Sequence, residues 1–298
     1  MLHRRIESGP VAGASGVRWR DSALLAYARA FEHPSKIRIV RWLVRRLAAG
    51  RIQVRYASGA VVAIDPADYV GWAIFKTGHY EPASLSLALR IMREEPGLFV
   101  DVGANFGWYT CAVAAAAART VVSIEPDCEN CASLRQNIAL GKLQNVIVFN
   151  GAAGSRVAAA QMIKRARTNS GTSAIRTKNG KPEPHANWVA TVPLNDLLNQ
   201  IVHPPTRPVL IKIDVEGFEP EVLAGLDFEG AFRPKNILME FDRQLALGAW
   251  GSPDRIQSFF AARNYDVLDV FGNPLRDLDA APEQNVWVRD RRADRAGS

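Results

Sequence analysis

The strongest constraint on the fold is a series of short apolar runs, separated by segments that can form helices. Each run has four or five residues, which is typical of strands that are covered on both faces of a sheet. Alternation of such strands with helices favours right-handed βαβ units and a parallel sheet. We expect an α/β fold with a doubly wound, mostly parallel sheet, formed by Leu98–Val102, Thr120–Ile124, Val146–Phe149, Val209–Ile213 and Ile237–Phe241.

Two parts of the chain depart from this alternation. Tyr265–Val270 and Val286–Val288 have only a turn region between them, with Gly272-Asn273-Pro274. This pattern predicts an antiparallel hairpin at the C-terminal edge of the sheet. Between the third and fourth runs, Arg156–Trp188 is polar and without periodicity. Long irregular insertions in α/β domains are commonly functional, so we expect a loop that faces the substrate.

The first 70 residues differ in composition from the rest. Residues 1–20 contain glycine, serine and arginine without periodicity, and we expect them to be disordered. Residues 21–70 are expected to form an accessory region. It would hold a basic amphipathic helix over Lys36–Ala49 and a β-hairpin of Ile52–Tyr56 and Ala60–Ile64.

Positive charge is concentrated at the start of the chain. Residues 1–60 hold twelve Lys/Arg and three Asp/Glu, whereas the whole chain has a net charge of +7. Such a segment can contact nucleic acid or a membrane surface, or be an ordinary solvated helix, which we favour. No apolar run reaches the roughly 18 residues of a membrane span, and three cysteines suit a reducing compartment. We expect a cytoplasmic protein with no nucleic-acid partner and at most weak contact with membranes. The oligomeric state is not indicated.

The most informative motif is the turn Asp101-Val102-Gly103-Ala104-Asn105-Phe106-Gly107, where a strand ends in an acid and a helix follows. Ligands of parallel sheets bind beyond the carboxyl ends of the strands. We expect Gly103 to allow close approach of a ligand to the backbone, and Gly107 to permit tight packing of helix against strand. Because G-x-G-x-x-G is absent and Asp101 precedes the first glycine, the turn suits a cationic ligand such as S-adenosylmethionine better than a pyrophosphate.

A second acid ends the next strand, 24 residues after Asp101. Glu125 can accept hydrogen bonds from both hydroxyl groups of a ribose. After the third strand, Ala152 can line an adenine, although a small residue is equally natural in a turn. From these motifs we interpret Asp101, Gly103, Asn105, Gly107, Glu125 and Ala152 as cofactor-binding residues.

These motifs, together with Leu210–Glu219 and Leu238–Phe241, resemble the FkbM-type methyltransferases over residues 76–270. The resemblance implies a Rossmann-like class I methyltransferase domain over residues 71–298, S-adenosyl-L-methionine as cofactor, and O-methyl transfer. His79-Tyr80-Glu81-Pro82 is also similar to the family, which implies that Glu81 contributes to the cofactor site. One departure is Leu194-Asn195-Asp196, where the family often has consecutive acids.

Asp214 and Glu216 follow the fourth run, which in this class of sheet lies beside the first, so both are expected to face the methyl donor. Asp214 can bind cofactor or substrate, and Glu216 can accept a hydroxyl proton as general base. Both can equally cap the next helix, whose first turn favours negative charge. Glu240, at the end of the fifth run, is a weaker candidate. No cluster has the spacing of metal ligands, so we expect no metal.

The sequence therefore predicts an enzyme that transfers a methyl group from S-adenosylmethionine to a hydroxyl of a small metabolite or glycan. Two alternatives remain open at this point. A nicotinamide-dependent oxidoreductase would also use an acid at the position of Glu125. A non-catalytic protein could instead bind nucleic acid or a membrane through the basic N-terminal region.

Overall fold

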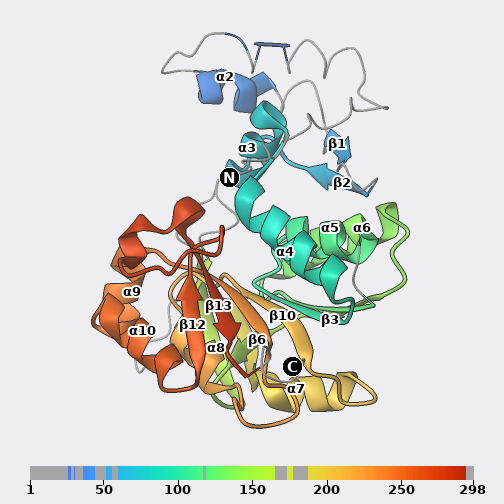
Figure 1. The fold of residues 1–298 in the computed structure, drawn as a ribbon. Helices are drawn as coiled ribbons and strands as arrows, with labels where there is room; N and C mark the ends of the chain where they lie inside the picture. Colours follow the sequence, from blue (N-terminus) through green and yellow to red (C-terminus); the bar gives the residue numbers. More distant parts are fainter. Residues whose placement is uncertain are drawn as a thin grey trace.

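A seven-stranded mixed sheet forms the centre of the fold, in the order β12-β13-β11-β10-β3-β4-β5. Figure 1 labels β12, β13, β10 and β3 of this sheet. The computed structural model describes residues 26–27, 30, 36–43, 52–55, 60–116, 119–164, 173–176 and 187–292. Five neighbouring strands, from β11 through β10, β3 and β4 to β5 at the edge, pair in parallel. This confirms the predicted doubly wound sheet. Their bounds are β3 Leu98–Val102, β4 Thr120–Ile124, β5 Val146–Phe149, β10 Pro208–Ile213 and β11 Asn236–Glu240.

The predicted C-terminal hairpin is formed by β12 (Tyr265–Leu268) and β13 (Asn285–Asp290), which pair antiparallel. The last strand, β13, also pairs antiparallel with β11. It is therefore inserted between β11 and β12, and β12 forms the edge of the sheet. Two helices that we did not predict, α9 (Arg243–Trp250) and α10 (Pro253–Ala261), connect β11 to β12.

Helices cover both faces of the sheet, because successive side chains of β3 belong to two different apolar cores. Phe99 belongs to the core that includes α4 (Pro82–Glu94) and α5 (Trp108–Ala116), and Ile138 of α6 (Cys128–Leu140) packs against that core. Val100 belongs to the opposite core, with residues of α7 (Leu194–Ile201), α8 (Glu219–Ala224) and α10. Successive side chains of a strand point to opposite faces, so the sheet separates two apolar layers.

The N-terminal region packs on the α4–α6 face. Its predicted hairpin is confirmed as β1 (Ile52–Arg55) and β2 (Val61–Ile64), and an unpredicted helix, α3 (Tyr69–Thr77), follows. Figure 1 shows β1, β2 and α3 above α4–α6. Asn137 of α6 accepts a hydrogen bond from the backbone N–H of Ala63 (2.8 Å) and donates one to its carbonyl (3.2 Å). The hairpin is thus tied to the main domain by specific contacts.

Some N-terminal predictions extend beyond the described residues. The basic helix is described as α2 (Lys36–Leu43), and the remainder of the predicted Lys36–Ala49 helix lies outside. The predicted disorder of residues 1–20 also lies outside the described residues. The boundary near residue 70 stays a prediction. No helix in the described part of the chain is both long and apolar enough to cross a bilayer.

The segment Arg156–Trp188, predicted as an irregular loop, contains strands where it is described. A second sheet has the order β6-β9-β7-β8, with bounds Ala152–Gly154, Asn187–Pro193, Ala158–Lys164 and Ser173–Arg176. Residues 165–172 and 177–186 lie outside the described part. The prediction was wrong because these strands are rich in alanine and polar residues. Their stability depends on pairing partners that are distant in the chain rather than on an apolar pattern.

Candidate active site

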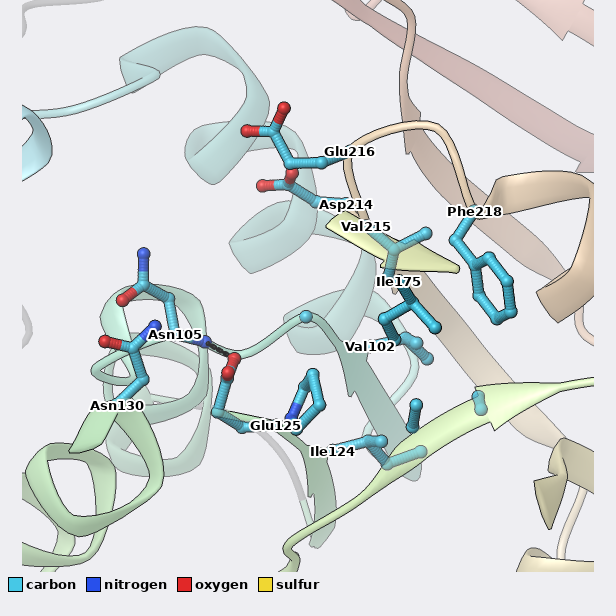
Figure 2. A pocket seen from close by; sticks show the side chains of 14 residues that line it. Val102, Asn105, Ile124, Glu125, Asn130, Ile175, Asp214, Val215, Glu216 and Phe218 are labelled. Carbon is cyan, nitrogen blue, oxygen red and sulfur yellow. Dashed lines mark hydrogen bonds between the residues drawn. The ribbon is translucent and has the colours of Figure 1, made fainter. Parts of the chain in front are cut away.

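The ends of β3 and β4 bring the two predicted acids to one edge of the sheet. Val102 pairs with Ile124, so the residues on either side of this pair, Asp101 and Glu125, lie at neighbouring strand ends. A narrow pocket of about 60 Å³ opens here, shown in Figure 2. It shares residues with a wider cleft of about 650 Å³. The residues common to both cavities are Gly103, Asn105, Asp214 and Glu216.

Glu125 is the best-defined carboxyl group of the narrow pocket. Its Oε2 accepts a hydrogen bond from the backbone N–H of Asn105 (2.7 Å), and its Oε1 accepts one from that of Asp127 (2.8 Å). The residue is only 4% exposed. Burial raises the pKa of Glu125 to about 7, although the N–H donors oppose this rise. A carboxylate oxygen has lone pairs for more than one donor, so the oriented group can also accept hydroxyl protons from a ligand.

The apolar part of the narrow pocket comes from several elements. Ala152 lines it, as predicted, and so do Ile124 at the end of β4 and Phe218 before α8. Ile175 of β8 also lines the pocket and lies close to Val215 in Figure 2. The second sheet thus contributes to the cavity, although not as the irregular loop that we expected.

The two glycines of the turn are required by neighbouring protein atoms. Gly103 has a φ of +82°, and a Cβ there would lie 1.8 Å from the carbonyl oxygen of Asp214. Gly107 has a φ of +93°, and its Cβ would lie 2.6 Å from Cδ1 of Leu134 in α6. The sequence predicts close approach of a ligand at Gly103 and packing of helix against strand at Gly107. In the structure, the steric reason for Gly103 is the contact between the turn after β3 and the loop after β10. The steric reason for Gly107 is the packing of the start of α5 against α6.

Asp101 lines the wide cleft rather than the narrow pocket. Its side chain is almost fully buried, and Oδ2 accepts a hydrogen bond from Thr110 Oγ1 at 2.6 Å. Its Oδ1 is buried and has no hydrogen-bond partner among the described residues. Burial raises the pKa of Asp101, whereas nearby Lys212 and the Thr110 hydroxyl lower it. An unsatisfied buried oxygen of this kind indicates a place for a donor group from a ligand or a water.

Asp214 and Glu240 form a carboxyl pair in which the two members differ in charge. Lys212 Nζ donates a hydrogen bond to Asp214 Oδ2 at 2.7 Å. Burial opposes ionisation of Asp214, but the charge of Lys212 and the hydrogen bond from Glu240 hold its pKa below the usual value. The charge of Asp214, together with burial, raises the pKa of Glu240 to about 11. At neutral pH, Asp214 is therefore ionised and Glu240 keeps its proton.

Glu81 lines the wide cleft and not the pocket of Glu125. It precedes α4 but does not cap it, because Glu283 accepts the hydrogen bonds of the helix N-terminus, from the N–H groups of Ala83 and Ser84 (2.9 and 2.8 Å). The Glu81 side chain instead accepts a hydrogen bond from the Tyr109 hydroxyl at 2.8 Å. Burial raises the pKa of Glu81, with the charge of nearby Lys212 acting in the opposite direction.

The possibility that Asp214 and Glu216 cap the next helix finds no support in the geometry. Helix α8 begins at Glu219, and Phe218 at its N-cap makes no side-chain capping bond. Glu216 lines both cavities, and Figure 2 shows it beside Asp214 on the loop that follows β10.

Backbone strain is concentrated around these cavities. In the described chain, seven non-glycine residues have positive φ, and five of them line one or both cavities. Residues in sparsely populated backbone regions cost of order 1–3 kcal/mol each and cluster at functional sites. The five are Glu81, Asn105, Glu216, Glu283 and Gln284.

Sequence reasoning missed several residues of the site. Lys212 was visible as a lone charge in the apolar run Leu210–Ile213, but we drew no inference from it. Tyr109 and Glu283 carried no local signal, because their contacts with Glu81 and α4 join distant parts of the chain. Within the described ranges, no group of three or more His, Cys, Asp or Glu residues could hold a metal ion.

Solved structures similar to this chain include the protein TYW2 and two O-methyltransferases. M. jannaschii TYW2, in complex with AdoMet, is 13% identical over 80% of this chain and 84% of its own, with a TM-score of 0.38. The O-methyltransferase from Bacillus cereus, in complex with SAH, is 14% identical over 70% and 80%, with a TM-score of 0.39. The O-methyltransferase TomG from Streptomyces achromogenes, in complex with SAM, is 13% identical over 75% and 86%, with a TM-score of 0.41.

A search of curated proteins finds no match. The family model described as "Methyltransferase FkbM domain" matches residues 101–267, which is more than half of the chain and spans the turn after β3, Glu125 and the β10 loop. The chain therefore belongs to the FkbM methyltransferase family.

Proposed function

We propose that this protein is an S-adenosylmethionine-dependent O-methyltransferase acting on a hydroxyl group of a small metabolite or sugar. Family membership supports methyl transfer, and the donor and the acceptor class are our inference. The observation that carries the proposal is the position of Asp101 and Glu125 at adjacent strand ends beside two connected cavities.

The residues present fit a nucleoside sulfonium. In the narrow pocket, Glu125 can accept hydrogen bonds from the ribose hydroxyl groups. Apolar contacts for an adenine can come from Ala152, Ile175 and Phe218. In the wide cleft, the unpartnered Oδ1 of Asp101 can accept a hydrogen bond from the donor's ammonium group. We keep Gly103, Asn105 and Gly107 as residues that shape the turn between the two cavities, and Glu81 as a carboxylate at the ammonium end.

The reaction needs little from the protein beyond positioning and proton transfer. When bound, S-adenosylmethionine supplies an electrophilic methyl group on a sulfonium that leaves as a neutral thioether. The residues of the two cavities would hold the acceptor oxygen in line with that methyl group, and one of them would take up the proton that the acceptor hydroxyl loses. Holding the two reactants in line can contribute about 7–11 kcal/mol.

Among the nearby carboxyl groups, Glu216 is the best candidate for the general base. Asp214 is stabilised as an anion by Lys212, which makes it a weak base, and Glu240 already holds a proton. Glu216 lines both cavities, so it can reach a hydroxyl group placed beside the methyl donor. In this proposal Asp214 binds and orients, and Glu216 takes the proton.

The decisive experiment measures the affinity for S-adenosylmethionine by calorimetry. Glu125→Ala should lose about 2–3 kcal/mol of binding free energy, on the order of 30- to 150-fold, because hydrogen bonds to a charged group are removed. Glu94→Ala, which changes an exposed glutamate at the end of α4, should bind as wild type does. Equal affinity of all three proteins would remove Glu125 from the donor site. A wild-type protein that does not bind the donor would end the proposal.

The acceptor class is tested separately, by mass spectrometry of a panel of hydroxylated metabolites and glycans incubated with the methyl donor. A product heavier by one methylene group, with the methyl on oxygen, is the expected result. Methylation on nitrogen or carbon only would contradict the O-methyl assignment while leaving methyl transfer intact.

A further inference from the structure

Lys212 occupies an unusual position, near the end of a central strand of the sheet. In the parallel register it lies between Asp101 of β3 and Leu238 of β11. Its side chain is only 4% exposed. Transfer of an ammonium group from water into a protein interior costs several kcal/mol unless it gains compensating interactions. The contacts of Lys212 should therefore reveal what offsets this cost.

The contacts of Lys212 link β10 and the loop that follows it to α5. Its Nζ lies 2.7 Å from Asp214 Oδ2 and 4.7 Å from the ring centroid of Tyr109 in α5. Burial alone would lower the pKa of Lys212, but the charges of Asp214, Asp101 and Glu81 raise it above its usual value. The charges of these three acids therefore favour the protonated form of the lysine.

The described part of the chain offers these acids no second lysine or arginine from the walls of the cleft. Among the described residues that line it, Lys212 is the only lysine or arginine. Further acidic residues, Glu240 and Glu216, lie on the side of Asp214, while Tyr80 and Tyr109 lie on the side of Glu81. Without Lys212, mutual repulsion would favour protonation of one or more of the acids.

We propose that Lys212 is a positioning residue for the methyl donor. Its ammonium group holds the Asp214 carboxylate at the junction of the two cavities and offsets the repulsion among Asp101, Glu81 and Asp214. Because one cation faces three acids, ionisation of Asp101 or Glu81 in addition to Asp214 leaves the cluster negative towards the ammonium and sulfonium groups of S-adenosylmethionine. Lys212 acts through these carboxylates and does not touch the reacting atoms. This inference rests on the proposed function.

The test compares the affinity for S-adenosylmethionine between pH 7 and pH 4.5 in four proteins. Lys212→Met should lose about tenfold or more affinity over this range beyond any loss in wild type, because its acids take up protons at higher pH; one unit of pKa corresponds to about tenfold. Lys212→Arg should restore most of the wild-type profile. Lys235→Met is the matched control, since it removes a lysine–carboxylate pair with Glu95 at the opposite end of the sheet.

The outcomes separate this inference from the proposed function. If wild type does not bind the donor, the proposed function fails. If wild type binds and Lys212→Met weakens binding equally at all pH values, Lys212 only supports packing and the inference is overturned.

A measurement on wild type keeps the test valid if Lys212→Met does not fold. The ¹³C NMR signal of the Asp214 carboxyl group, assigned by its loss in Asp214→Asn, should report a pKa below the usual range of an aspartate. Titration of this group above pH 5 would overturn the role of Lys212.

Discussion

The narrow pocket and the wide cleft meet at Gly103, but their carboxyl groups are stabilised differently. In the narrow pocket, the carboxyl of Glu125 is held by two backbone N–H groups and has a pKa of about 7. In the wide cleft, several carboxyl groups surround Lys212, and their pKa values diverge, with Asp214 lowered and Glu240 raised to about 11. A carboxyl held by neutral donors suits recognition of hydroxyl groups. A cluster with one shared cation suits a charged ligand and proton transfer.

The largest expected effect is on the free energy of unfolding, at a residue that lines both cavities. Gly103→Ala should destabilise the fold by about 4 kcal/mol or more, because its Cβ would meet the backbone carbonyl of Asp214 and the residue would keep a positive φ. Urea unfolding measures the loss. The control is Gly248→Ala in α9, where a Cβ would meet nothing within 4 Å, so it should be neutral or slightly stabilising. Equal stability of Gly103→Ala and wild type would show that the turn after β3 and the loop after β10 are not in the close contact described.

An intermediate effect should concern the reaction step rather than binding of the methyl donor. Glu216→Gln is expected to lower kcat by about 10²–10⁴-fold, because a general base contributes on this scale. Its affinity for S-adenosylmethionine should change much less than that of Glu125→Ala. Steady-state kinetics with an acceptor from the panel, together with calorimetry, separates the two parameters. Unchanged kcat in Glu216→Gln would shift the role of base to another group of the cleft.

The smallest expected effect is a release of protons from Glu125 in the narrow pocket when the methyl donor binds. With a pKa near 7, Glu125 is about half protonated at pH 7 without ligand. Hydroxyl donors from a ribose would stabilise the carboxylate and lower this pKa, so donor binding should release up to about half a proton at pH 7. Above pH 8.5 the release from this group should vanish, because Glu125 is already ionised.

Calorimetry in PIPES and Tris, whose heats of ionisation differ, measures this proton release. The Glu125→Ala protein provides the control, since it lacks the titrating group. Proton uptake by wild type at pH 7, absent in the variant, would mean that the ligand favours the neutral form of Glu125 and that hydroxyl groups are not its partners.

Much of the central sheet was predictable because its signals are local. The apolar runs of β3, β4 and β5 were located to the residue, and the acids that follow them could be assigned to one edge from the geometry of parallel sheets alone. The strands of the 156–188 segment and the helices α3, α9 and α10 were missed, because their sequences lack a clear apolar period or were too short to show one.

The site was predictable to a similar extent and for the same reason. Asp101, Glu125, Asp214 and Glu216 were named from their positions after strands, and all four line the two connected cavities. Their ionisation could not be predicted, since it depends on burial and on neighbours from other strands. Nothing in the order of residues indicates that Glu240 keeps a proton while Asp214 does not.

By itself, the sequence determined the kind of sheet, the edge at which the candidate site lies and the acids available there, because strand periodicity and βαβ handedness are properties of short segments. Only the tertiary structure decided which of those acids are charged and why Gly103 must be glycine. It also decided that Glu283, rather than Glu81, accepts hydrogen bonds from the N–H groups at the N-terminus of α4. Charge, close packing and solvation act between atoms that are near in space, and these pairs are up to 200 residues apart along the chain.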